Sequence, residues 1–211
     1  MFEFMKMGGK RKKVTLVLGG GSARGIAHIG VLKVLEREKV PIDMIVGTSI
    51  GSLIGAGYST GITVQDMEKK ASAFSWEKLF DLTFPRLALI EGKKMDEAIS
   101  DIMQGMEFKD AKIPLYIVTT DIETNEEIIF SSGDLKKAIR ASCSWPGIFN
   151  PVEIDGRMLV DGGVKNSVPT DIAKRLGADF IIASDVGFCV KNGRIENILP
   201  MLLQTFQIMG E

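Results

Sequence analysis

The chain has 211 residues, a length that suits one domain with a sizeable hydrophobic core. Apolar residues make up 45% of the chain and charged residues 25%, which excludes a disordered or collagen-like protein. The net charge of -1 gives no global field for nucleic acid, so we expect no nucleic-acid partner, and no apolar run is long enough to span a membrane.

The first 13 residues are predicted to form a basic extension, and residues 14–211 a single domain. The extension contains Lys10-Arg11-Lys12-Lys13, which fits either a solvated segment before the first buried strand or a contact with anionic lipid head groups. Residues 1–9 lack the continuous apolar stretch of a signal peptide. We therefore expect a soluble, cytoplasmic protein, with peripheral membrane contact as the open alternative. A helical pattern is still present at Glu211, which leaves a C-terminal truncation open.

The first half of the chain twice shows a strand, a glycine turn and a helix. Val14–Leu18 is a short apolar run that ends at three glycines, and helical spacing follows over 26–38. A second short strand over 42–46 ends at Gly47 and precedes a helix over 50–58 that is rich in Gly and Ala. This alternation indicates an α/β protein with a largely parallel sheet.

The rest of the chain continues with helices and strands. The patterns predict helices over 63–74, 93–103, 135–142, 169–176 and from 198 onward, and strands over 115–120, 127–130 and 180–186. Asp155-Gly156 between two short strands predicts a two-residue hairpin over 152–160. Residues 75–90 are predicted to be a loop or broken helix. Its apolar side chains line an acyl groove, lie on a lipid surface or pack as ordinary core; they include Trp76, Phe80, Phe84 and Leu87.

Ser49 lies in Gly47-Thr48-Ser49-Ile50-Gly51, between an apolar strand and a glycine-rich helix. A strand-to-helix turn of this kind exposes the hydroxyl of its serine in a strained backbone conformation. The turn is so tight that Gly47 and Gly51 are needed to avoid Cβ clashes. The helix that follows directs its partial positive charge at the same place. We predict that Ser49 is a catalytic nucleophile; the plain alternative is a serine that caps a buried helix.

A second glycine-rich turn, residues 18–25, precedes the first helix and exposes several backbone N–H groups in one direction. Such donors hold a phosphate or the oxyanion of an acyl-transfer intermediate. The dinucleotide pattern does not match in register, because its middle glycine is replaced by Ser22 and no acidic residue ends the second strand. Adjacent parallel strands would bring both turns to one edge of the sheet. Arg24 either braces this loop, contacts a phosphate or lies on the surface.

The general base is predicted to be a carboxylate. The chain has one histidine, His28, and its apolar helical setting is typical of a packed residue. Asp161 ends a short strand and is followed by Gly162-Gly163, which leave room for a close approach. Partial burial can raise a carboxyl pKa enough for it to accept a serine proton. Asp121, at the end of the strand over 115–120, is the rival base.

The cysteines, Cys143 and Cys189, have neither the spacing of metal ligands nor that of a disulfide framework. This usage favours a reducing compartment without excluding a bridge between the two. We predict no metal and no cofactor.

Three segments together resemble the patatin-like phospholipase family. They are Gly20-Gly21-Ser22-Ala23-Arg24-Gly25, the pentapeptide around Ser49, and Asp161-Gly162-Gly163, and their order and spacing match the family. Residues 141–149 also look like the family's segment ahead of the aspartate. The similarity runs from about 14 to 186 and is closest to small bacterial members. The resemblance implies a three-layer α/β/α sandwich with a mostly parallel central sheet.

The resemblance also implies roles for individual residues. Ser49 and Asp161 would form a Ser-Asp dyad, and the backbone N–H groups of Gly20, Gly21 and Ser22 would form the oxyanion hole. Motif positions that support the site are Arg24, Gly25, Gly47, Gly51, Gly162 and Gly163. One departure is Ser22, where the family usually has glycine. If the loop needs a positive φ there, serine would cost about 1 kcal/mol or more.

The expected function is that of a serine lipid acyl hydrolase, of the phospholipase A, lysophospholipase or carboxylesterase type, that works through an acyl-enzyme. Its partner would be a lipid or another acyl ester. One alternative is an acyltransferase or thioesterase with the same dyad. An alternative of another class is a non-catalytic lipid- or nucleotide-binding protein with a decayed site.

Overall fold

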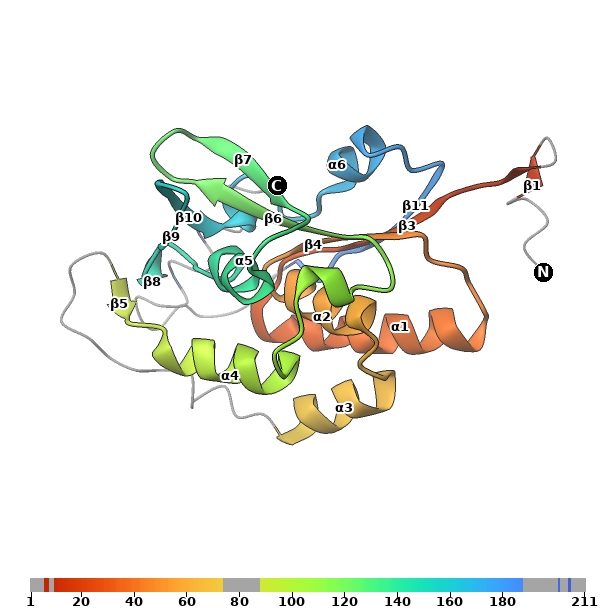
Figure 1. Cartoon of the computed structure of the whole chain (residues 1–211), viewed down its shortest axis with the longest axis horizontal. Helices are drawn as coiled ribbons and strands as arrows, with labels where there is room; N and C mark the ends of the chain where they lie inside the picture. Colours follow the sequence, from red (N-terminus) through yellow and green to blue (C-terminus); the bar gives the residue numbers. More distant parts are fainter. Residues whose placement is uncertain (1–5, 8–9, 74–87, 188–200, 202–204, 206–211) are drawn as a thin grey trace.

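The computed structural model describes residues 6–7, 10–73, 88–187, 201 and 205 (Figure 1). Its centre is a seven-stranded sheet with the order β11-β3-β4-β6-β10-β9, to which β7 is added by pairing with β6. Neighbours among β11, β3, β4 and β6 are parallel, whereas β7, β9 and β10 pair antiparallel. The strand bounds are Val14–Leu18 (β3), Met44–Thr48 (β4), Leu115–Asp121 (β6), Glu126–Phe130 (β7), Val152–Ile154 (β9), Arg157–Asp161 (β10) and Phe180–Ser184 (β11).

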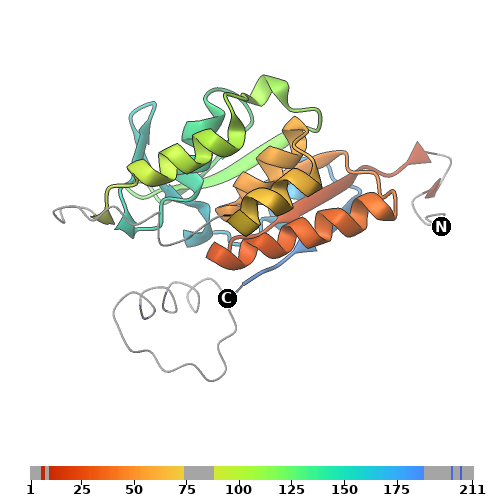
Figure 2. The same cartoon turned by 90° about the horizontal axis from the view of Figure 1, so that it is seen from below.

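Helices cover both faces of this sheet. Figure 1 shows α6 on one side of the sheet and α1 to α5 on the other, and Figure 2 shows α1, α3 and α4 spread across the second face. The molecule is therefore a mixed α/β protein with a mostly parallel central sheet between two helical layers, as predicted. The helix bounds are Ala27–Arg37 (α1), Ile50–Thr60 (α2), Val64–Ala73 (α3), Lys93–Met103 (α4), Leu135–Ser142 (α5) and Thr170–Arg175 (α6).

The core follows from side-chain alternation along the strands. In β3, Leu16 and Leu18 join the large cluster that includes α1, α2, α4 and α5, whereas Val17 joins the smaller cluster under α6. Successive side chains of a strand point to opposite faces, so a strand that is apolar at every position must be covered on both sides. The apolar runs in the sequence are therefore explained by the two helical layers.

Most predicted elements lie within two residues of their observed bounds, and the bounds of α4 and α5 agree fully. The Asp155-Gly156 hairpin between β9 and β10 is confirmed, with φ values of 52° and 74° at the two turn residues. Two pairs of very short strands were not predicted. They are β1 (Lys6–Met7) with β2 (Lys10–Arg11), and β5 (Ala88–Ile90) with β8 (Gly147–Phe149). Strands of two or three residues are too short to show the alternation of apolar and polar side chains by which a strand is predicted from sequence.

One edge of β6 is shared by two strands, and this sharing positions the site. Along that edge β4 pairs in parallel as far as Thr48, opposite Val118. The antiparallel strand β10 takes over at Asp161, opposite Thr119. The other edge of β6 belongs to β7. The ends of β4 and β10 therefore meet at consecutive residues of β6.

Several predicted features lie outside the described residues. They are the apolar segment with Trp76, Phe80, Phe84 and Leu87, the cysteine at 189, and most of the helix predicted from 198. Within the described part of the chain, no helix has the length and apolar character needed to cross a bilayer.

Candidate active site

Ser49 occupies a sharp turn between β4 and α2. Its backbone has φ 54° and ψ -127°, which is rare for a residue with a side chain and costs about 1–3 kcal/mol. The glycines beside it are required by packing. A Cβ at Gly51 would lie 2.1 Å from the carbonyl oxygen of Leu18, and one at Gly47 would lie 2.7 Å from that of Gly51. The turn thus has the strain and the small neighbours that the sequence predicted.

Asp161 lies beside Ser49, although 112 residues separate them in the chain. The Ser49 Oγ donates a hydrogen bond of 2.6 Å to Asp161 Oδ2, and the Gly163 N–H donates one of 2.7 Å to Asp161 Oδ1. A Cβ at Gly162 would lie 2.4 Å from the carbonyl oxygen of Val118, so the chain passes too close to β6 for a side chain there.

Asp161 is only 5% exposed. Burial raises the pKa of Asp161 to about 6, and the hydrogen bonds from Ser49 and Gly163 oppose that rise. A carboxyl group with this pKa is ionised at neutral pH, yet is a much stronger base than an ordinary aspartate. The geometry and the pKa both suit removal of the Ser49 proton.

The glycine loop lies against the same turn, since a Cβ at Gly20 would be 3.4 Å from the Cβ of Ser49. The Gly20 N–H donates to the Ser167 carbonyl at 2.9 Å, so this amide is engaged within the fold. The oxyanion role of Gly20 stays a prediction, and it would require this amide to leave the Ser167 carbonyl. The N–H groups of Gly21 and Ser22 have no hydrogen-bond acceptor among the described residues. These two amides remain the candidate donors.

Ser22 adopts a left-handed backbone conformation, with φ 50°. The condition under which serine would be costly at this position is thus met. In this conformation the Cβ of a serine lies too close to the backbone, which costs about 1–2 kcal/mol relative to glycine. Ser22 nevertheless keeps its N–H, so the strain does not remove a donor.

His28 supports the loop from behind. The ring is fully buried, with Nε2 2.9 Å from the Gly19 carbonyl and Nδ1 2.9 Å from the Ser184 hydroxyl. A carbonyl only accepts, so Nε2 carries the proton and Nδ1 accepts from Ser184. Burial lowers the pKa of His28, which keeps the ring neutral. The histidine is the packed residue that the sequence predicted.

Two further motif residues hold the loop in place. The Arg24 guanidinium donates to the Gly187 carbonyl at 3.0 Å, in agreement with the bracing role that was one of its predicted alternatives. A Cβ at Gly25 would lie 2.2 Å from the Ile50 side chain, so the loop and the start of α2 are in close contact.

Asp121, the rival base, is used elsewhere. Its Oδ1 accepts from the N–H groups of Glu123 and Thr124 at 3.1 and 3.3 Å, and its Oδ2 pairs with Arg157 at 3.1 Å. These contacts close the turn between β6 and β7 and tie it to β10. The carboxylate stabilises the sheet and has no hydrogen bond to Ser49.

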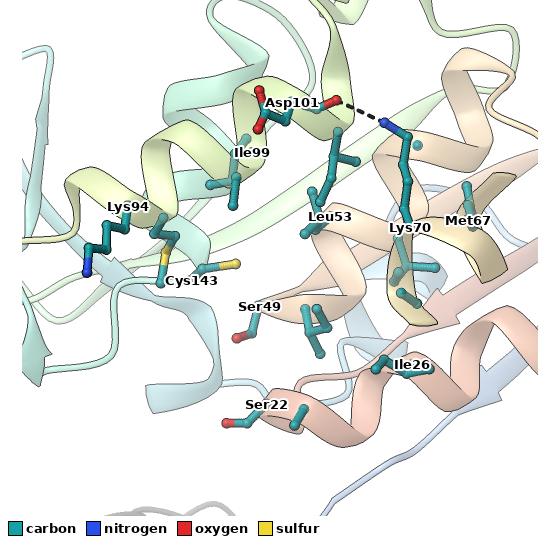
Figure 3. Close-up of a pocket in the computed structure, with 18 of the residues that line it drawn as sticks. Ser22, Ile26, Ser49, Leu53, Met67, Lys70, Lys94, Ile99, Asp101 and Cys143 are labelled. Carbon is teal, nitrogen blue, oxygen red and sulfur yellow. Dashed lines mark hydrogen bonds between the residues drawn. The ribbon is translucent and has the colours of Figure 1, made fainter. Parts of the chain in front are cut away.

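A cavity of about 880 Å³ extends from Ser49 and Asp161 between α2, α3 and α4 (Figure 3). Its walls are mostly apolar. At the end away from Ser49, the Lys70 Nζ donates to the Asp101 carbonyl at 2.9 Å and so connects α3 to α4. The sequence analysis offered an acyl groove at residues 76–87 only as one of three alternatives, and it did not identify these walls, although the helical spacing of their apolar residues was available. They include Ile50, Leu53, Ile54, Met67, Ala71, Met95, Ala98, Ile99 and Ile102.

Two other kinds of chemistry have little support in the described residues. No group of three or more His, Cys, Asp or Glu side chains there could hold a metal ion. Cys143 also lines the cavity, but burial raises the pKa of its thiol to about 12. A thiol with that pKa is not ionised near neutral pH and is a poor nucleophile.

Comparisons with known proteins agree with this architecture. The family model described as patatin-like phospholipase matches residues 16–174. In fold, residues over 72% of the chain superpose on 46% of VipD from Legionella pneumophila, with a TM-score of 0.55 and 14% identity.

Two curated relatives are similar in sequence. The chain is 42% identical over 182 residues to the patatin-like phospholipase domain-containing protein ZK370.4 of Caenorhabditis elegans, and 40% identical over 180 residues to lysophospholipase NTE1 of Scheffersomyces stipitis. Each alignment covers 82% of this chain but only 14% and 12% of the respective relative. The family match and these identities show that the chain belongs to the patatin-like phospholipase family.

Proposed function

We propose that this domain is a serine lipid acyl hydrolase, of the phospholipase A, lysophospholipase or carboxylesterase type. Ser49 is the nucleophile and Asp161 is the general base. The observation that carries the proposal is the 2.6 Å hydrogen bond from the Ser49 hydroxyl to a buried carboxylate at one end of an apolar cavity. The relative named a lysophospholipase supports the same class of substrate.

Acylation begins when the Ser49 Oγ attacks the ester carbonyl and Asp161 takes its proton. The carbonyl oxygen becomes an oxyanion, for which the Gly21 and Ser22 N–H groups are the proposed donors. The intermediate then expels the alcohol, which receives the proton from Asp161. An acyl group is left on Ser49.

Deacylation repeats these steps with water. Asp161 accepts a proton from the attacking water, the second oxyanion forms at the same carbonyl, and the bond to Ser49 breaks. The proton returns to the Ser49 oxygen and the fatty acid leaves. One carboxyl group thus serves as base and acid in turn, a use for which a pKa of about 6 is suited.

The apolar cavity is the proposed site for the acyl chain, because it begins at Ser49 and its walls are mostly aliphatic. For location, we propose a cytoplasmic domain with peripheral membrane contact. The basic run at residues 10–13 and a lipid substrate support this, although the Arg11 side chain is paired with Asp43.

The direct test uses Ser49→Ala and Asp161→Asn with a p-nitrophenyl butyrate assay and fluorophosphonate labelling. We expect each variant to lose at least about 10³-fold in kcat/KM, by analogy with removal of other nucleophiles and bases. We also expect labelling in the wild type and none in Ser49→Ala.

Undiminished turnover in Ser49→Ala would refute the assignment. A wild-type protein that is folded but neither turns over nor labels would favour the non-catalytic binder. Addition of an alcohol or thiol acceptor separates the hydrolase from the acyltransferase alternative, since a transferase forms a new ester or thioester faster than free acid. A thioester substrate compared with the matching oxygen ester tests the thioesterase alternative.

A further inference from the structure

The strained backbone at Ser49 needs contacts that hold it. On its N–H side the contact comes from the end of α5, where the Ser142 Oγ lies 2.8 Å from the Ser49 nitrogen. The same hydroxyl lies 2.7 Å from the Val118 carbonyl in β6. An amide only donates and a carbonyl only accepts, so Ser142 must accept from Ser49 and donate to Val118. The direction of both hydrogen bonds is thereby fixed.

This serine is held firmly. Its side chain is fully buried, and α5 packs on both β6 and α2 (Figure 1). It supplies a hydrogen-bond partner to the Ser49 N–H and to the Val118 carbonyl, and a buried polar group left without a partner costs about 1–3 kcal/mol. The hydroxyl therefore fixes the nucleophile turn relative to β6, the strand with which the Asp161-bearing strand β10 pairs.

The same short segment also holds the base. The Asp161 N–H donates to the Ser144 carbonyl at 2.9 Å. The Ser144 hydroxyl in turn donates to the Arg140 carbonyl at 2.7 Å and accepts from the Arg140 guanidinium. Arg140 is buried as well, and it lies 5.8 Å from the centre of the Phe149 ring. Two residues of one segment thus bind the backbones of both members of the dyad.

We infer that Ser142 is a positioning residue of the dyad: through its hydroxyl it fixes the Ser49 backbone, and so the distance from the Ser49 Oγ to Asp161. This rests on the proposed function. Ser142 touches neither substrate nor the reacting atoms. Its effect is on the alignment of proton transfer, to which the rate is sensitive because a displacement of about 1 Å can cost 10²-fold.

The test compares Ser142→Ala with Ser59→Ala. Ser59 is also a fully buried helical serine, and its hydroxyl donates to the Ala56 carbonyl at 3.0 Å, away from the dyad. We expect Ser142→Ala to lower kcat for p-nitrophenyl butyrate roughly 10- to 100-fold, with KM nearly unchanged. Ser59→Ala should keep the wild-type kcat while losing a similar amount of thermal stability.

A second readout is the acid limb of the pH–rate profile. Burial raises the pKa of Asp161, and the Ser49 hydrogen bond opposes that rise. If Ser49 shifts away in Ser142→Ala, that opposition weakens and the midpoint of the acid limb moves to higher pH. Mere loss of stability would not move it. If Ser142→Ala does not fold, Ser142→Cys carries the same expectation, because a thiol is a weak acceptor.

Equal kcat values and an unmoved acid limb in Ser142→Ala and Ser59→Ala would overturn the inference. A wild type that is no more active than Ser49→Ala would instead overturn the proposed function. The two failures are therefore distinguishable in one set of assays.

Discussion

Asp161 sets the expected pH dependence of the reaction. The base must be ionised to accept a proton, and burial raises its pKa to about 6, so kcat/KM should fall as pH drops through about 6 and reach a plateau above about 7. An ordinary aspartate would place this limb near pH 4. The measurement is kcat/KM for p-nitrophenyl butyrate between about pH 4.5 and 8.5. Asp121→Asn should leave the midpoint unchanged, and a limb near pH 4 would contradict the role given to Asp161.

The residues of the site differ in how far the sequence predicted them. The positions of Ser49 and Asp161 were predictable because Ser49 directly follows a strand between Gly47 and Gly51, and Asp161 ends a strand before Gly162. The hydrogen bond from the Gly20 N–H could not be predicted, because its acceptor is the carbonyl of Ser167, which lies near the loop only in the folded chain. The hydrogen bond between Ser142 and Ser49 could not be predicted for the same reason, since 93 residues separate the two in the chain.

At the scale of elements, α4 is predicted to control acyl chain length. Ala98 lines the cavity, and Ala98→Leu would fill part of the space between α4 and α2. We expect the ratio of palmitate to butyrate ester hydrolysis to fall about 10-fold, since even one methylene group in an apolar pocket is worth roughly 10- to 200-fold. The measurement is kcat/KM for both p-nitrophenyl esters.

Lys136→Leu is the matched control, because it also adds a leucine to a helix but is exposed on α5 and does not line the cavity. Its ester ratio should equal that of the wild type. If Ala98→Leu lowered kcat/KM equally for both esters, the acyl chain would not occupy this cavity.

Elements with a long periodic pattern were predictable. Helix α4 buries Met95, Ile99 and Met103 at helical spacing, which is why its bounds agree with the structure. The pairing of β5 with β8 was not predictable, because each has three residues and the partner lies far along the chain. The sharing of one edge of β6 by β4 and β10 is likewise a property of the assembled sheet, and no local sequence pattern predicts it.

For the whole molecule, the open question is contact with a membrane. The net charge is only -1, so binding to anionic vesicles would depend on the basic run rather than on an overall field. We expect co-sedimentation with phosphatidylserine-containing vesicles at low salt and release at high salt. The double variant Lys12→Gln, Lys13→Gln should bind roughly 30-fold more weakly, at about 1 kcal/mol per lysine.

A charge-matched control is Lys136→Gln, Lys137→Gln, which removes two adjacent exposed lysines from α5. It should bind vesicles as the wild type does. Equal weakening in both double variants would assign the effect to net charge, and no binding by the wild type would remove the membrane contact from the proposal.

The division of the β6 edge between β4 and β10 has a consequence for when activity appears. The nucleophile turn belongs to the early part of the chain, whereas its base arrives 112 residues later on a strand that docks beside it. If Asp161 is the base, a chain in which β10 has not yet paired with β6 would hold Ser49 without its proton acceptor. Under the proposed function, ester hydrolysis would require β10 to be paired with β6, so activity would report that this part of the sheet has assembled.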